Sequence, residues 1–412
     1  MIEIFLAIIL GILFGTISGI TPGLHVNTIG IIIFSFSDKL LNNNSLLSIC
    51  TFFITIAISH AMIEFLPSLL IGVPTEDTIL SIQPSHRLLF EGRGYETIRL
   101  TSVGGYGSII LLIILMPLLM IFLPTIYNFL KEYIAFLLII TMVLILYFYN
   151  NNNTQRLISA LIFLVSGILG LFVLNSNLGS NLGLLTLLSG LFSVSNLIIS
   201  VNEEPKIPPQ KEDKTILIDK GFKKSILAGS LSGCILGLLP GFGPAQGTII
   251  AQALTLNKDI KPEEFIVTNS GINVSDTLFS LIAIYLINNP RSAISMYINY
   301  IIPKITLNHV IFFIFVSLVS VSIACILSIK LGDYLLTHIT NLNYKKLNIT
   351  IILLITTIIL VYTILTGGCV WYVVLCYITS ISLGILPNLL NLNKSNLMGI
   401  LIIPTIITYL GF

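Results

Sequence analysis

Two acidic residues lie inside long apolar stretches of this sequence. Glu64 follows His60 by four residues, so a helix there carries both side chains on one face. Asn269, Asn273 and Asp276 have the spacing i, i+4, i+7 and also share a face of a second apolar segment. A carboxyl group at membrane depth is costly, and by default it marks a proton or cation pathway that faces the interior of a helix bundle. The sequence therefore predicts Glu64, Asp276 and Asn273 as ion-coupling residues.

A structural explanation competes with this prediction. Glu64 and His60 pair with each other near a helix end in that alternative, and Asn269 lies near enough to the interface to be hydrated. The functional interpretation is favoured for Glu64 and Asp276, whereas both interpretations stay open for His60 and Asn269.

A Pro-Gly pair interrupts an apolar segment at two places, Pro22-Gly23 and Pro240-Gly241. Proline removes a backbone donor and breaks the helical hydrogen-bond ladder, and free backbone groups at membrane depth are tolerated only inside protein or beside a wet cavity. Each break precedes polar side chains and a new helix whose positive dipole end points into the gap. Inverted-repeat transporters hold anionic groups in this way; the alternative is a kink that serves glycine packing. The predicted substrate-binding residues are Thr21, Gly23, His25, Asn27, Thr28, Gly241, Gly243, Gln246 and Thr248.

The elements that position these residues are indicated by a repeated pattern. Gly11, Gly15, Gly19, Pro22 and Gly23 match Gly229, Gly233, Gly237, Pro240 and Gly241 at one constant offset of 218 residues. One GxxxG stretch is a weak signal of close helix packing, but five identities at one offset indicate an internal duplication. A polar segment lies between the copies. We expect an N-terminal repeat over 1–201, a linker over 202–224 and a C-terminal repeat over 225–412.

Composition places these repeats in a membrane. Of the 412 residues, 55% are hydrophobic and 9% are charged, against about 25% charged in an ordinary soluble domain. Apolar runs recur at close to the ~20 residues that span a bilayer core. The chain is therefore predicted to be an all-α integral membrane protein of the plasma membrane, in contact with membrane lipid.

Other classes of protein find no support in the sequence. The 20 lysines and arginines are scattered, which argues against nucleic acid as a partner, and the five cysteines form no CxxC pair, which argues against a disulfide framework or zinc site. No metalloprotease, P-loop or serine-hydrolase motif occurs. We expect no enzyme activity and no cofactor, with coupling to Na⁺ or H⁺ left open.

The basic residues predict the topology through the positive-inside rule. If the linker is cytoplasmic and each Pro-Gly segment is a re-entrant hairpin, 16 basic residues lie inside and 4 lie outside; full crossing of both segments gives 12 and 8. The hairpin arrangement is favoured. It makes the two repeats inverted, each with a broken hairpin and about five transmembrane helices.

These motifs resemble those of one transporter family, over most of the chain. The resemblance rests on the glycine and Pro-Gly patterns above and on the polar run from Gly72-Val-Pro-Thr-Glu-Asp-Thr to Glu91-Gly-Arg-Gly-Tyr-Glu. The chain is similar to the large permease subunit (TctA-type) of the tripartite tricarboxylate transporters, above all to its shorter archaeal-like members. It differs from the tricarboxylate members at Leu24 to Asn27, where those members are glycine-rich.

The resemblance implies a cation-coupled or proton-coupled permease for small carboxylates. It also implies two partners, a small membrane subunit and an extracytoplasmic binding protein. The polar run itself has two interpretations, since Glu76 and Asp77 either ligate a coupling cation or pair with Arg87 or Arg93 in a solvated cap. Together with the residue pattern, the resemblance to this family predicts secondary active transport of a small anionic solute. The alternatives are a translocase of a lipid-linked phosphate and, with less support, an intramembrane enzyme.

Overall fold

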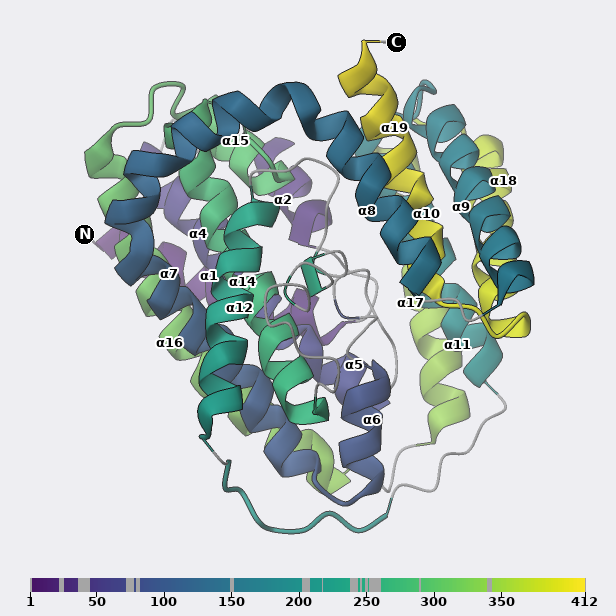
Figure 1. Cartoon of the computed structure of the whole chain (residues 1–412), viewed down its shortest axis with the longest axis horizontal. Coiled ribbons are helices and arrows are strands. Elements are labelled where there is room, and N and C mark those ends of the chain that lie inside the picture. The colour runs from purple at the N-terminus through teal and green to yellow at the C-terminus, as the bar shows by residue number, and fades with distance from the viewer. Residues whose placement is uncertain are drawn as a thin grey trace. The chain divides into compact units, whose positions relative to one another are not determined.

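The computed structural model describes residues 2–21, 26–35, 45–71, 78, 82–148, 152–201, 208–216, 218–237, 244, 247–248, 251, 261–288, 290–338 and 343–411. All regular elements in these ranges are helical (Figure 1). In chain order they are α1 (Ile2–Ile20), α2 (Val26–Ser35), α4 (Leu46–Ile63), α5 (Phe65–Ile71), α6 (Ile82–Phe90), α7 (Gly94–Leu130), the 3₁₀ turn η2 (Lys131–Tyr133), α8 (Ile134–Phe148), α9 (Asn153–Leu174), α10 (Ser180–Leu188), the π-helical turn η3 (Ser189–Val194), α11 (Ser195–Ser200), α12 (Lys220–Leu236), α14 (Pro262–Ile287), α15 (Ala293–Ile301), α16 (Leu307–His338), α17 (Tyr344–Leu365), α18 (Val370–Leu389), the 3₁₀ turn η5 (Lys394–Met398) and α19 (Gly399–Leu410).

Nine helical stretches within these ranges are long and apolar enough to cross a membrane. Five of them precede the polar linker and four follow it. The longest single helix, α7, has 37 residues and is therefore about 56 Å long, well beyond the ~30 Å of a hydrocarbon core. The prediction of an all-α, multi-pass integral membrane protein is confirmed.

Local sequence explains where several helices begin. The Asp219 carboxylate accepts the backbone N–H of Phe222 at 2.8 Å and caps α12. Ser292 and Ser295 form a reciprocal capping box at the start of α15. Pro262 occupies the first turn of α14, where its missing N–H has no helical partner to lose. These caps satisfy backbone groups that the ends of helices leave exposed.

The chain folds as two compact units, each built from segments on both sides of the linker. Unit 1 comprises residues 1–72, 80–128 and 206–341, and unit 2 comprises residues 73–79, 129–205 and 342–412. This division by contact differs from the predicted division by sequence repeat. The repeat boundaries stay a prediction about the origin of the chain, whereas the units describe how the helices pack.

Glycine stripes hold two helix pairs of unit 1 together. A Cβ atom added at Gly15 of α1 would lie 2.8 Å from the carbonyl oxygen of Ile56, and one added at Gly233 of α12 would lie 2.8 Å from that of Ile272. Ile56 and Ile272 are 216 residues apart. The same offset relates the other contacts of the two stripes, from Thr55 to Gly271, Ser59 to Ser275 and Ile63 to Phe279. The two pairs, α1 with α4 and α12 with α14, therefore pack in the same register, which supports the predicted duplication.

Each long helix of unit 1 packs against the glycine-stripe pair from the other side of the linker. From α7, the Ser108 hydroxyl donates to the carbonyl of Ile226 in α12 at 3.2 Å. From α16, the Ser320 hydroxyl donates to Thr55 Oγ1 in α4 at 3.0 Å. Helices from the two sides of the linker consequently run side by side in this unit (Figure 1). Unit 1 cannot be separated into its two sequence halves without breaking these contacts.

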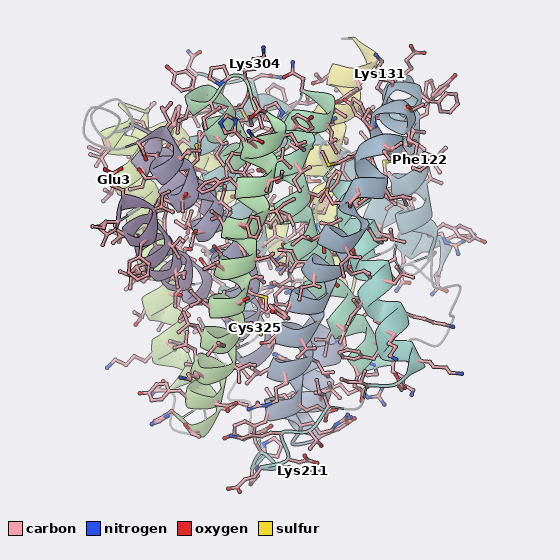
Figure 2. The ribbon with its side chains drawn as sticks, turned by 90° about the vertical axis from the view of Figure 1, so that its left-hand side faces the viewer. Glu3, Phe122, Lys131, Lys211, Lys304 and Cys325 are labelled. Atoms are coloured by element: carbon pink, nitrogen blue, oxygen red, sulfur yellow. The ribbon has the colours of Figure 1, made fainter. Side chains whose placement is uncertain are left out.

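Two lysines with opposite predicted sides of the membrane lie at opposite ends of unit 1. Figure 2 shows Lys304 at one end and Lys211, in the linker, at the other. The charge count places Lys304 outside and the linker inside, so this separation agrees with the predicted topology. Which end faces the cytoplasm stays a prediction.

Unit 2 has its own close helix packing. The backbone of α19 approaches α9 at Gly170, where an added Cβ would meet the carbonyl group of Ile400. Polar side chains cross-link other elements of this unit: Lys394 Nζ donates to Ser195 Oγ at 2.9 Å, and Asn396 Nδ2 donates to Ser159 Oγ at 2.9 Å.

Candidate functional site

Glu64 lies at an interruption between α4 and α5. Pro67 has no N–H to donate to the carbonyl of Ile63, and its ring disfavours a regular helix at that point. The helix is accordingly interrupted at Glu64, whose backbone N–H still donates to the His60 carbonyl at 2.9 Å. The Glu64 side chain is 2% exposed. A proline thus places a carboxyl group inside the helix bundle of unit 1.

The Glu64 carboxyl group is bound by α14, from the other side of the linker. Asn273 Nδ2 donates to Glu64 Oε1 at 2.5 Å and to the Ala61 carbonyl at 3.1 Å. Both amide hydrogens therefore point to α4. Asn273 is 4% exposed, so this contact lies inside unit 1 and joins helices from the two sequence halves.

His60 connects the same carboxyl group to α1. Its Nε2 lies 3.5 Å from Glu64 Oε2, and its Nδ1 lies 2.8 Å from Ser18 Oγ. The Ser18 hydroxyl also donates to the Gly15 carbonyl at 3.1 Å. Ser18, His60, Glu64 and Asn273 thus form one buried polar cluster, which we call the α1–α4–α14 cluster.

Thr248, in the segment that follows Pro240-Gly241, also contacts α14. Thr248 is buried, and its hydroxyl lies 2.7 Å from Asn269 Oδ1 and 2.9 Å from the Pro244 carbonyl. Asn269 is fully buried. Asn269 and Asn273 are one turn apart on α14, so one helix makes polar contacts both to Thr248 and to Glu64.

The packing register pairs His60 with Asp276. The offset of 216 residues that relates the contacts of the two glycine stripes also separates these two positions, whereas Glu64 corresponds to Ser280. Asp276 is partly buried and follows Asn273 by one turn of α14. The duplication would therefore place a titratable group at the same position of α4 and α14, and Glu64 is an additional acid of the first half.

Only part of the predicted substrate site lies in the described ranges. Thr21 follows α1, and its N–H donates to the Ile17 carbonyl at 3.1 Å. Asn27 and Thr28 lie in the first turn of α2, so a helix does begin just after the first break. Gly23, His25, Gly241, Gly243 and Gln246 lie outside the described residues, as do Glu76 and Asp77 of the polar run.

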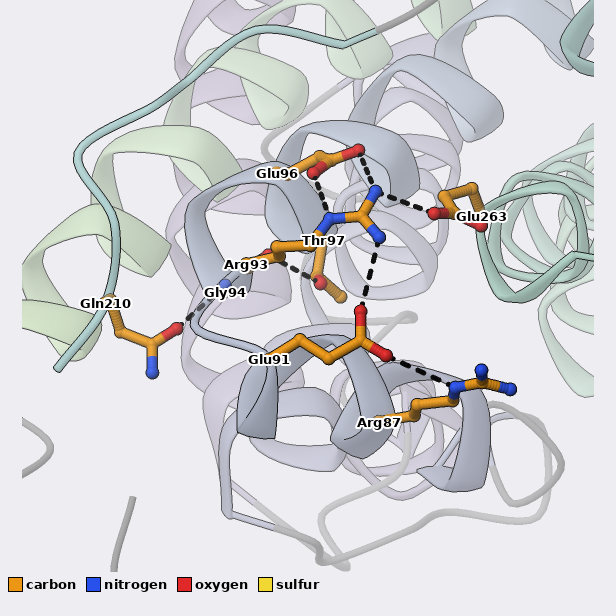
Figure 3. A network of polar contacts seen from close by, with 8 residues as sticks. All are labelled: Arg87, Glu91, Arg93, Gly94, Glu96, Thr97, Gln210 and Glu263. Carbon is orange, nitrogen blue, oxygen red and sulfur yellow. Dashed lines mark hydrogen bonds and ion pairs between the residues drawn. The ribbon is translucent and has the colours of Figure 1, made fainter. Parts of the chain in front are cut away.

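The polar run contributes a charged network at one end of unit 1 (Figure 3). Arg93 binds Glu96 of α7 through two hydrogen bonds of 2.7 Å and Glu263 of α14 at 2.6 Å. The hydrogen bond to Glu96 raises the pKa of the Arg93 guanidinium above its usual range. Arg87 pairs with Glu91 at 3.3 Å. Both arginines therefore have acidic partners inside the described part of the chain.

Sequence reasoning missed Ser18 and Ser320. Ser18 had a usable signal, because Gly11, Gly15 and Ser18 follow the spacing i, i+4, i+7 and therefore share one face of α1. Ser320 has no such signal, since its contact with Thr55 depends on how α16 packs against α4.

The α1–α4–α14 cluster is suited to proton exchange between a carboxyl and an imidazole group. Its oxygen and nitrogen atoms face one another inside unit 1, away from bulk water. Among the described residues no group of three or more histidine, cysteine, aspartate or glutamate side chains is arranged to hold a metal ion.

One family model and one archaeal relative match nearly the whole chain. The family model described as "Tripartite tricarboxylate transporter TctA family" matches residues 5–399. An uncharacterized protein of Methanocaldococcus jannaschii, MJ1079, is 32% identical over 409 residues, which cover 98% of each chain. No solved structure matches.

Proposed function

Because this chain belongs to the TctA family of the tripartite tricarboxylate transporters, we propose that it is a secondary active permease for a small carboxylate, coupled to H⁺ or Na⁺. The family is a transporter family, so the chain is a multi-pass membrane component of carboxylate transport. The location of the solute site, the identity of the coupling ion and the partner proteins are proposals.

The observation that carries the proposal is the contact between Glu64 and Asn273. A carboxyl group in the middle of a bundle disfavours insertion by ~2.5 to 3.5 kcal/mol, so an acid with no task there is selected against. Glu64 is bound by a residue of α14, and α14 also bonds Thr248 in the second hairpin region through Asn269. A change in the protonation of Glu64 can therefore act on the helix that supports the hairpin.

We place the solute between the two Pro-Gly segments. Backbone N–H groups at the start of α2 and of the helix after Pro240-Gly241 would bind the carboxylate groups of the solute. Asn27, Thr28 and Thr248 would add side-chain donors. A small membrane subunit and an extracytoplasmic binding protein are the partners that the family suggests.

Uptake by purified protein in liposomes tests this function. Mono-, di- and tricarboxylates, amino acids and polyprenyl phosphates are each added with and without Na⁺ and a pH gradient, and thermal stabilisation is measured in parallel. We expect one carboxylate both to stabilise the protein and to accumulate in response to one of the two ion gradients. Stabilisation by polyprenyl phosphate alone would instead favour the lipid translocase.

Two glycine variants separate the solute site from helix packing. Gly23→Val or Gly241→Val puts a branched side chain where backbone is proposed to approach the solute, and should abolish uptake while the protein still inserts and folds. Gly107→Ala is a matched control, because an added Cβ there meets only the flexible Ile226 side chain. Normal uptake by both valine variants would reduce the Pro-Gly segments to a packing device.

A further inference from the structure

The contacts of Glu64 with Asn273 and His60 give its two carboxyl oxygens different roles. The Asn273 side chain contacts the Ala61 carbonyl, which can only accept, so the group facing α4 is its NH₂ and not its oxygen. The second hydrogen of that NH₂ group goes to Glu64 Oε1. Oε1 is therefore an acceptor, and an acidic proton of Glu64 resides on Oε2.

The neighbouring imidazole ring is oriented in a matching way. The Ser18 hydroxyl donates to the Gly15 carbonyl, so its oxygen accepts from His60 Nδ1–H at 2.8 Å. A neutral histidine with its hydrogen on Nδ1 has a lone pair on Nε2. This lone pair faces Glu64 Oε2, 3.5 Å away.

One shared proton satisfies both Nε2 of His60 and Oε2 of Glu64. With a proton between Oε2 and Nε2 the pair has no net charge, as carboxylic acid with imidazole or as carboxylate with imidazolium. Without it, a carboxylate faces a nitrogen lone pair in a buried position, which is unfavourable in a low-dielectric environment. The proton should therefore leave only when water reaches the pair.

Asn273 offers the Glu64 carboxyl group an amide NH₂ and His60 offers it a ring nitrogen. Hard cations bind to oxygen ligands, so these two contacts suit a proton better than Na⁺.

Charged groups also lie on described helices that pack against α4. On α14 the carboxyl group of Asp276 follows Asn273 by one turn. On α1 the acid is Glu3, which accepts the backbone N–H of Ser45 at the opposite end of α4. From α16, the uncharged Ser320 donates to Thr55 of α4.

We propose that His60 and Glu64 bind a single proton between Nε2 and Oε2, with Ser18 and Asn273 as positioning residues, and that this proton is the coupling ion. The last part rests on the transport function proposed above. In each cycle the proton is taken up from water on one side and returned to water on the other, so no other reactant is consumed.

Nuclear magnetic resonance of protein labelled with ¹⁵N-histidine tests the proton site without any solute. The signals of the five histidines are followed over a pH titration in detergent, and those of His60 are identified by their loss in His60→Asn. We expect Nδ1 of His60 to carry hydrogen at every pH and Nε2 to titrate in one step. In Glu64→Gln the step should be displaced, because the neighbouring carboxylate is removed.

Controls decide between the outcomes. His309→Asn, which removes a partly exposed histidine, should leave the His60 step unchanged. Added Na⁺ at constant pH should not move the step. A His60 ring with hydrogen on Nε2 alone, a step unaffected by Glu64→Gln, or a step that Na⁺ displaces would each overturn the proton site. If the proton site behaves as expected but the protein transports no carboxylate, the proposed transport function is wrong and the proton site is still supported.

Discussion

Asn273 donates a hydrogen bond of 2.5 Å to Glu64, although 209 residues separate the two in the sequence. This bond joins α14 to the interruption between α4 and α5, inside unit 1. It joins buried polar groups of the two sequence halves.

We expect Asn273→Leu to destabilise the protein, because a buried carboxyl group loses its donor. The loss of one partner of a buried polar pair costs about 1 to 3 kcal/mol, and more when the group left behind is charged. Unfolding in detergent of wild type, Asn273→Leu, Glu64→Gln and the double variant gives the coupling energy between the two side chains. Strictly additive effects would show that the two residues do not interact.

Glycine substitutions test the packing of the two helix pairs. In Gly15→Ala and Gly233→Ala the new methyl group meets the backbone of Ile56 or Ile272 at 2.8 Å, so overpacking should destabilise each variant by about 1 to 3 kcal/mol. In Gly183→Ala of α10 the nearest atom is a side-chain methyl group at 3.3 Å. Alanine favours a helix over glycine by about 1 kcal/mol, so this control should be as stable as wild type or more so.

The measurement is the unfolding midpoint of each variant in the same detergent. Equal midpoints for Gly15→Ala, Gly233→Ala and Gly183→Ala would contradict the close approach of α1 to α4 and of α12 to α14.

The sequence was sufficient to predict helices, membrane insertion and the glycine stripes, because each depends on local composition or spacing. It also predicted that Glu64 and His60 share a face. It could not predict the partner of Glu64, since Asn273 reaches it only after α14 has packed against α4. The division into units was missed for the same reason: α7 and α16 each pack against helices that are distant in the chain.

Replacement of Gln210 by alanine should make the linker more accessible to trypsin. The Gln210 side chain accepts the N–H of Gly94 at 2.8 Å and donates to the Leu89 carbonyl at 3.1 Å, which fastens residues 208–216 to α6 and α7 (Figure 3). Gln210→Ala removes both bonds, so trypsin should cut after Lys211 and Lys214 several times faster. Cleavage after Lys345 is an internal control and should keep its rate. An unchanged rate at both linker lysines would show that other contacts hold the linker.

The stability of the protein should rise between about pH 7 and pH 10.5 because of Lys394. This side chain is 6% exposed, and burial lowers the pKa of its ammonium group from 10.5 to about 7. Within that window the unfolded chain binds the proton and the folded chain does not, so protonation favours unfolding as the pH falls. Each unit by which the pKa of Lys394 differs between the folded and the unfolded chain corresponds to about 1.4 kcal/mol of unfolding free energy.

Thermal unfolding over this pH range checks the effect of Lys394. Lys394→Met should be more stable than wild type at pH 7 and should show a smaller rise toward alkaline pH. Lys345→Met, which replaces an exposed lysine, should keep the slope of wild type. A wild-type slope in Lys394→Met would assign the pH dependence to other groups.

The two halves of the chain should have opposite orientations in the membrane. The hairpin arrangement places 16 basic residues on one side and 4 on the other, and it puts Lys39 outside and Lys258 inside. Single cysteines are introduced at Lys39, Lys258 and Glu212 in a background without the five native cysteines, and each is labelled in sealed vesicles by a reagent that does not cross the membrane. The Glu212 position reports the side of the linker. We expect Lys258→Cys to react from the same side as Glu212→Cys, and Lys39→Cys from the opposite side. Labelling of the Lys39 and Lys258 positions from one side would rule out the inverted arrangement, and with it the placement of both Pro-Gly segments around one solute.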